Sequence, residues 1–144
     1  MRLLVNGEPR EVEARNDETL LAVLRREGFL SVRETCGVGV CGACTVLVDG
    51  ASISGCLLLA RAAEGRELTT VEGLGENDPV QRAFADAHAF QCGYCTPGMI
   101  LTAKALLAET PSLSEEEIRI AMAGNLCRCG SYVKIIDAIK EAAT

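Results

Sequence analysis

The chain contains few aromatic side chains and fewer cations than anions. Among its 144 residues there is no Trp, with two Tyr and three Phe, and 14 Lys plus Arg stand against 20 Asp plus Glu, for a net charge of −6. A surface that binds nucleic acid uses cations to neutralise phosphates and aromatic rings to stack on bases. We therefore expect no nucleic-acid partner. The single histidine, His88, also excludes mechanisms that need several imidazole groups.

Long hydrophobic runs are missing as well. The longest apolar run covers residues 56–60, whereas a helix needs about 20 apolar residues to span a bilayer. The first residues, MRLLVNGEPREVEA, lack the apolar core and the small-residue cleavage site of a signal peptide. We expect no membrane insertion and a cytoplasmic location. In a reducing compartment the eight cysteines indicate metal ligands more than disulfides.

The first half of the chain mixes short strands with one helix. Either Asn16 or Asp17 can act as the N-cap of this helix, which ends before Gly28. The pair Asp49-Gly50 is typical of a tight hairpin turn. Strand-like runs cover residues 1–5, 10–14, 45–48 and 67–71.

The second half of the chain follows helical periodicity throughout. Asp78-Pro79 and Thr96-Pro97 each place a proline at the first position of a helix, and Ser114 with Glu117 forms a capping box. A last apolar stripe begins at Tyr132. Hydrophobic residues make up 49% of the chain, enough to fill a core in each half. We therefore predict an α+β protein with one domain at 1–75 and a helical domain at 76–144.

Four cysteines of the first half have a spacing that is typical of plant-type [2Fe-2S] ferredoxins. Cys36, Cys41 and Cys44 form the pattern C-x4-C-x2-C, and Cys56 follows after eleven residues. A two-iron cluster needs four converging thiolates and backbone N–H groups that point at its sulfurs. The loop contains glycines that allow positive φ angles and close backbone approach, namely Gly37, Gly39 and Gly42. We predict a first cluster here.

The other four cysteines lie in two turns between helices of the second half. Cys92 and Cys95 form C-x2-C, and after 31 residues Cys127 and Cys129 form C-x-C. Two helix hairpins can bring two such pairs together at one end of a bundle. A helix N-terminus behind each pair, at Thr96 and near Ser131, is expected to favour the thiolate form. We predict a second cluster here.

Two other uses of the cysteines stay open at this point. A zinc site is one, because C-x2-C is common in zinc proteins and in redox-active dithiols. A disulfide framework is another, and the lack of a secretion signal disfavours it. The C-x-C pair is unusual for zinc. No nucleophile–base pair, phosphate-binding loop or dinucleotide fingerprint is present, so we expect no catalytic residue and no substrate chemistry in this chain.

Three stretches together resemble a known family. ETCGVGVCGACTVLVDG, QCGYCTPGMI and GNLCRCG are similar to the small iron–sulfur subunit of the molybdenum hydroxylases, the xanthine dehydrogenase family. All eight cysteines match the family's pattern. The resemblance implies an N-terminal β-grasp, plant-ferredoxin-like domain with one [2Fe-2S] cluster and an all-α four-helix domain with the other.

The resemblance also implies a role and partners. The helical-domain cluster is expected beside the molybdopterin of a large catalytic subunit, where Gln91 and Cys129 would contact the pterin. Electrons would pass from there to the β-grasp cluster and on to an FAD-binding subunit in most members. Cys129 is followed by Gly130, as in the isoquinoline and nicotinate type, some of which use a cytochrome instead. The alternatives are a free-standing two-cluster ferredoxin and a zinc-stapled interaction module.

Overall fold

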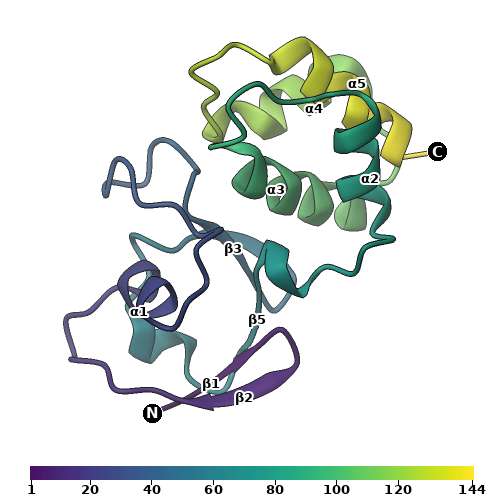
Figure 1. Ribbon diagram of the computed structural model, residues 1–144. Helices are drawn as coiled ribbons and strands as arrows, with labels where there is room; N and C mark the ends of the chain where they lie inside the picture. Colours follow the sequence, from purple (N-terminus) through teal and green to yellow (C-terminus); the bar gives the residue numbers. More distant parts are fainter.

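The computed structural model describes residues 1–144 as a mixed sheet with one helix, followed by a group of four helices (Figure 1). The elements of the first half are β1 (Arg2–Val5), β2 (Glu8–Glu11), α1 (Leu20–Arg26), β3 (Thr45–Val48), β4 (Ala51–Ser54), β5 (Glu67–Thr69) and the 3₁₀ turns η1 (Ala60–Ala63) and η2 (Val71–Gly73). Those of the second half are α2 (Pro79–Asp86), α3 (Thr96–Glu109), α4 (Glu115–Ala121), η3 (Met122–Gly124) and α5 (Tyr132–Ala142).

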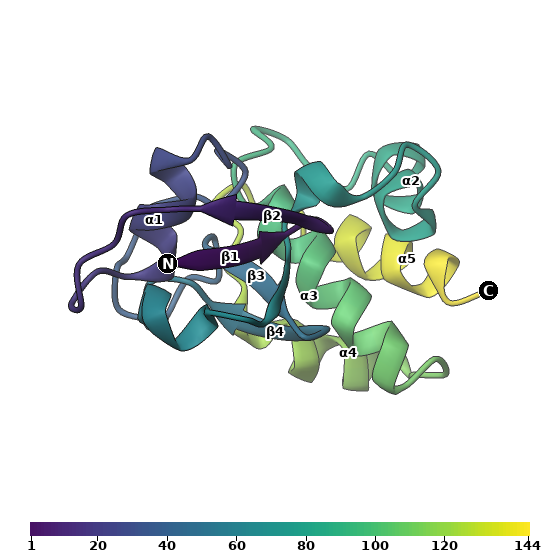
Figure 2. The same cartoon turned by 90° about the horizontal axis from the view of Figure 1, so that it is seen from below.

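The sheet has the strand order β2-β1-β5-β3-β4. β1 and β5 run parallel, and every other neighbouring pair is antiparallel. This topology, with α1 packed against the sheet, is the β-grasp fold that the family resemblance implied. β3 is buried along its whole length because α3 contacts it from the helical half (Figure 2). A strand covered on both faces explains the unbroken apolar-rich run TVLV.

Local differences from the expected elements have simple causes. The N-cap of α1 is Thr19, whose hydroxyl accepts from the N–H of Ala22 at 3.3 Å, and neither Asn16 nor Asp17 plays this part. Residues 15–18 instead form a turn, closed by the N–H of Glu18 on the carbonyl of Arg15. β2 begins earlier than expected, at Glu8, because the tight turn at residues 6–7 pairs it at once with β1.

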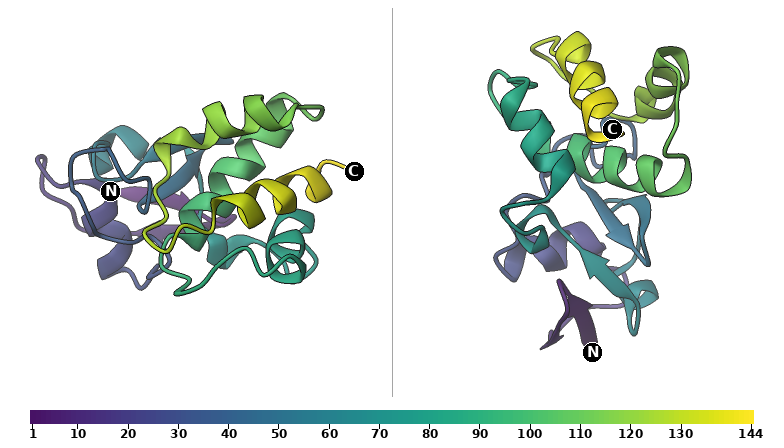
Figure 3. Two further views of the ribbon diagram at one scale, coloured as in Figure 1. Left: turned by 90° about the horizontal axis from the view of Figure 1, so that it is seen from above. Right: turned by 90° about the vertical axis from the view of Figure 1, so that its right-hand side faces the viewer.

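Two of the three start signals of the helical half are found as predicted. The third is wrong by one residue, because α3 already includes Thr96 and its N-cap is Cys95, which makes no side-chain cap bond. Asp78 accepts from the N–H groups of Val80 and Gln81, and Ser114 forms the full capping box with Glu117. α2 packs against α3 and α5, and α4 packs against α5. The right-hand view of Figure 3 shows the four helices above the sheet, with the N-terminal hairpin at the opposite end of the molecule.

Hydrophobic side chains gather in two separate cores. In the first, Leu3, Leu24 and Leu68 are fully buried between sheet and α1. In the second, Phe84 and Ile139 are buried between helices. Each half thus has its own apolar interior. None of the helices is both long and apolar enough to cross a membrane.

Candidate metal centres

The first cysteine loop lies between α1 and β3, and its shape depends on glycine. Gly37, Gly39 and Gly42 all have positive φ angles, between 68° and 75°. Such residues turn successive N–H groups toward the inside of a loop, where they attract anions. The N–H of Val38 points at the sulfur of Cys36, at 3.5 Å.

The four thiols of this group lie in two pairs. Cys36 neighbours Cys41, and Cys44 neighbours Cys56 just after the β3–β4 hairpin. N–H groups of the loop, with that of Val38 contributing most, lower the pKa of Cys36 to about 6. Burial raises the pKa of Cys44 to about 11. The group therefore combines a thiol that ionises readily at the surface with one held in a dry interior.

The second group is assembled from two turns. Cys92 and Cys95 lie between α2 and α3, while Cys127 and Cys129 lie between η3 and α5. Cys92 neighbours Cys129 and Cys95 neighbours Cys127, so the thiols again form two pairs, each spanning both turns. The structure thus unites the C-x2-C and C-x-C motifs, as the sequence predicted.

Backbone donors also serve the second group. The N–H of Tyr94 donates to the sulfur of Cys92 at 3.5 Å and lowers its pKa. Burial has the largest single effect on Cys127 and raises its pKa. The N–H of Ser131, at 3.4 Å from the sulfur, and further hydrogen bonds from Cys95, Ser131 and Cys129 together outweigh burial, so that the pKa lies below its usual value.

The expectation that a helix N-terminus favours the thiolate form agrees with Cys127, whose sulfur accepts from the N-cap of α5, but is wrong for Cys95. α3 begins directly behind Cys95, which is its N-cap residue, yet the pKa of Cys95 is raised to about 12. Burial is the main cause, and the neighbouring thiols add to it. In the chain without metal, burial therefore decides the state of this thiol, and the helix N-terminus does not.

Pairs of thiols are the arrangement that a two-iron cluster needs. In a [2Fe-2S] cluster each iron binds two thiolates and two bridging sulfides, whereas a structural zinc ion gathers four ligands around one centre. The donor set and its pairing fit the two-iron cluster.

The two cysteine groups meet at the junction of the halves. The N–H of Leu126 donates to the carbonyl of Cys41 at 2.9 Å, and the amide of Asn125 donates to the carbonyl of Gly42 at 3.2 Å. A Cβ on Gly98, in α3, would collide with the same Gly42 carbonyl. Sequence reasoning missed Gly98, Asn125 and Leu126, because none carries metal-binding chemistry and their contacts with the first loop span more than 50 positions.

Gln91 and Cys129 lie next to each other at the surface of the helical half. The side-chain amide of Gln91 donates to the carbonyl of Cys129 at 3.1 Å. A shallow pocket of about 240 Å³ adjoins them, and its walls include Phe90, Gly130 and Lys134.

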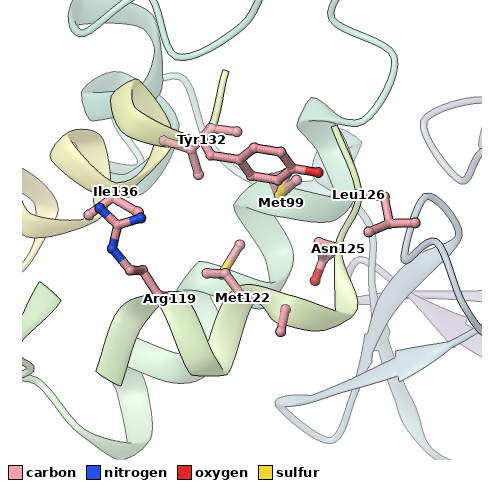
Figure 4. A pocket seen from close by; sticks show the side chains of 9 residues that line it. Met99, Arg119, Met122, Asn125, Leu126, Tyr132 and Ile136 are labelled. Atoms are coloured by element: carbon pink, nitrogen blue, oxygen red, sulfur yellow. The ribbon is translucent and has the colours of Figure 1, made fainter. Parts of the chain in front are cut away.

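A more apolar pocket of about 280 Å³ lies between α3, α4 and α5 (Figure 4). Figure 4 shows the ring of Tyr132 above Met99, with its hydroxyl toward the segment that holds Leu126. That hydroxyl accepts from the N–H of Cys127 at 2.8 Å. The pocket thus shares a wall with the C-x-C turn.

Comparisons with known proteins agree with this geometry. Residues 3–73 match the family described as "2Fe-2S iron-sulfur cluster binding domain", and residues 70–140 match the "[2Fe-2S] binding domain". The nicotinate dehydrogenase small FeS subunit of Eubacterium barkeri is 47% identical over 99% of this chain and 93% of the relative. The xanthine dehydrogenase iron-sulfur-binding subunit of Escherichia coli O157:H7 is 48% identical over 95% of this chain and 89% of the relative.

A solved structure is similar over the same length. Quinoline 2-oxidoreductase from Pseudomonas putida 86 contains a chain that matches with a TM-score of 0.92 and 46% identity, over 99% of this chain and 92% of that one. Both halves, and both cysteine groups, fall within the matched residues. The chain belongs to the family of small [2Fe-2S] iron–sulfur subunits of the molybdenum hydroxylases, the xanthine dehydrogenase family.

Proposed function

We propose that this chain is the electron-transfer component of a molybdenum-containing hydroxylase and connects a large molybdopterin-binding subunit to an FAD-binding subunit or another acceptor. Each [2Fe-2S] cluster, when bound, can take up and release one electron at a time. The substrate is hydroxylated in the large subunit, so this chain supplies no catalytic residue. The observation that carries the proposal is the arrangement of eight free thiols as two groups of two pairs.

The proposed ligands are the eight cysteines. The first cluster is held by Cys36, Cys41, Cys44 and Cys56, and the second by Cys92, Cys95, Cys127 and Cys129. The pairing of the thiols supports this assignment, as do the N–H groups that point at three of the sulfurs. These donors offset the negative charge of a cluster and thereby raise its reduction potential.

We assign the molybdopterin side of the chain to the helical half. Gln91 is exposed and its amide bonds to Cys129, so both residues are available to a group in a partner subunit. The pocket beside them would admit part of that group. Electrons would then leave through the β-grasp half, whose loop exposes Cys36 and Cys41 in part.

Exposed apolar side chains favour a subunit over a free-standing ferredoxin. Val38 is 65% exposed and Leu57 62% exposed beside the first cysteine loop, and Val133 is 66% exposed beside the C-x-C turn. Large aliphatic side chains that are exposed at both electron-transfer sites are typical of surfaces that a partner covers. We also place the domain boundary between residues 75 and 76, shortly after the change of core, since the first core ends at Leu68 and Val71 and Leu74 pack against the second. We assign the chain to the cytoplasm.

The proposal is tested on the complex in which the chain is purified. Iron and acid-labile sulfide are measured, and native mass spectrometry identifies the co-purifying chains. We expect equal amounts of iron and sulfide, and a large molybdopterin-containing partner. Zinc without sulfide would refute the clusters, and an iron-loaded chain that purifies alone from its own cell would support the free-standing ferredoxin.

A further inference from the structure

The side chain of Tyr94 crosses from one cysteine group to the other. Tyr94 lies in the C-x2-C turn, yet its hydroxyl donates to the carbonyl of Glu34 at 2.8 Å, 60 positions earlier in the chain. The hydroxyl of Thr35 lies 3.4 Å from the same phenol oxygen. The guanidinium carbon of Arg33 lies over the ring, 5.2 Å from its centre, in a cation–π contact. Three consecutive residues that lead into Cys36 thus contact this one side chain.

The backbone of the same residue serves the other group. The N–H of Tyr94 donates to the sulfur of Cys92 at 3.5 Å. Tyr94 is 43% exposed, so burial of its ring does not account for its position. Directed contacts hold the ring instead, and all of them come from the segment before the first cysteine.

These contacts matter because the first cysteine loop is tied to the helical half at two ends. Its later part, at Cys41 and Gly42, is bonded to the segment at residues 125–126. Before Cys36, the hydrogen bonds that reach the helical half both end on the Tyr94 phenol. Other bonds of this segment stay within residues 1–75: the N–H of Arg33 donates to the carbonyl of Ala43, and the N–H and hydroxyl of Ser31 donate to the carboxylate of Glu72.

We propose that Tyr94 is a positioning residue that fixes the start of the first cysteine loop to the helical half, and that its hydroxyl thereby sets the distance and orientation between the two clusters. This inference rests on the proposed function, since it presupposes a cluster in each group. Electron transfer between two centres weakens steeply with distance, so a small shift of the loop would slow it. The magnetic interaction between two reduced, paramagnetic clusters falls with the same separation.

The test compares the only two tyrosines of the chain. Tyr94→Phe keeps the ring under Arg33 and removes the hydroxyl that bonds to Glu34. Tyr132→Phe is the matched control, because it removes a phenol oxygen that accepts from the N–H of Cys127, within the helical half. Iron content and the low-temperature EPR spectrum of the dithionite-reduced full chain, in its complex, are measured for each variant and for the unaltered protein.

We expect Tyr94→Phe to reduce or abolish the splitting that each signal owes to the other cluster, while Tyr132→Phe keeps the splitting and alters only the helical-domain signal. Loss of the β-grasp signal alone in Tyr94→Phe also supports the inference, because the loop has then lost its anchor. An unchanged splitting at full iron content overturns it, as does simultaneous loss of both clusters, which would indicate a general role in folding. If the unaltered protein itself lacks two signals, the proposed function fails instead.

A second variant leaves the hydroxyl in place. Arg33→Gln removes the cation above the ring and is expected to reduce the splitting in the same direction as Tyr94→Phe, but by less. A larger effect of Arg33→Gln than of Tyr94→Phe would contradict the assignment of the positioning role to the hydroxyl.

Discussion

The two cysteine groups reach the same arrangement by different routes. In the β-grasp half, three of the four thiols lie within nine residues of one loop, so local backbone geometry places most of the site. In the helical half, the pairs lie in separate turns, and every thiol pair joins one turn to the other. The first group depends on glycine conformations, whereas the second depends on the packing of helices α2, α3 and α5.

The difference between the groups does not extend to their electrostatics. Each has a thiol whose pKa is lowered by a backbone N–H, at Cys36 and at Cys92, and a thiol whose pKa is raised by burial, at the buried Cys44 and the half-buried Cys95. The two scaffolds therefore offer a cluster a similar environment. Backbone N–H groups donate to one thiol of each group, and another thiol of each group is partly or fully removed from water.

Removal of iron and sulfide should have the largest effect, and it should fall mainly on the helical half. Without a cluster the two turns lose the bonds that join them, because metal binding contributes directly to folding free energy. A loss of several kcal/mol would lower the melting temperature by roughly 10 °C or more, at about 4 °C per kcal/mol. Hydrogen exchange of α3 and α5 should accelerate more than that of the sheet. Equal melting of the loaded and the cluster-free protein would contradict this prediction.

Loss of one ligand should separate the two sites. Cys56→Ser and Cys127→Ser each remove a buried thiol from one group. Each variant should contain about half the iron of the unaltered protein, which is checked by metal analysis, and should retain only the other site's spectroscopic signal. If either variant lost all its iron, the two sites would not be independent.

A methyl group at Gly42 should disturb the junction between the groups. A Cβ there would lie 2.5 Å from the carbonyl oxygen of Gly124 and from the amide nitrogen of Asn125, at a φ of +71°. Strain of this kind costs of order 1–3 kcal/mol, and the collision adds to it. Gly50→Ala is the control, since Gly50 has a φ of +82° with nothing within 4 Å of its Cβ. Thermal melting should show a clearly larger loss for Gly42→Ala, and equal losses would exclude a role for the contact.

Truncation of Asn125 should cost less than the change at Gly42. Asn125→Ala removes one donor to the carbonyl of Gly42, which still accepts from the N–H and the hydroxyl of Thr45. We therefore expect the cost of one lost hydrogen bond, toward the upper end of roughly 0.5–1.5 kcal/mol. Asn77→Ala, at an exposed position, is the control and should be close to neutral. Denaturant unfolding measures the free energy of unfolding of both variants. If Asn125→Ala were as stable as the unaltered protein, the hydrogen bond between Asn125 and Gly42 would not stabilise the junction.

The smallest expected effect lies far from both groups. Ser114→Ala removes the N-cap of α4 and should cost about 1 kcal/mol. Iron content and both cluster signals should stay unchanged, as α4 carries none of the cysteines. Any loss of the helical-domain signal would show that the second site depends on the whole bundle and not on its two turns.

The sequence predicted the features that follow from local chemistry. The turn at Asp49-Gly50, the strand at residues 45–48 and the caps at Asp78 and Ser114 are found as expected, because each depends on side chains within a few positions. The β-grasp and four-helix architecture came from the resemblance and is confirmed. Wrong details, such as the cap of α1, arise where several cap-forming residues stand close together.

Features that depend on the contact between the halves could not be predicted. Asn125, Gly98 and Tyr94 have no distinctive spacing, and their partners lie 55 or more positions away. The raised pKa of Cys95 is a further example, since burial is a property of the packed bundle and not of the C-x2-C motif. Pairing of thiols across the turns, likewise, became visible only in three dimensions.

One spectrum bears on the central claim more directly than any variant. The dithionite-reduced, iron-loaded protein is measured by low-temperature EPR with spin quantification. We expect two distinct signals of equal intensity, one for each group of thiols. A single signal, or a spectrum without any iron–sulfur signal from a sample that contains no iron, would contradict the claim that this chain holds two [2Fe-2S] clusters.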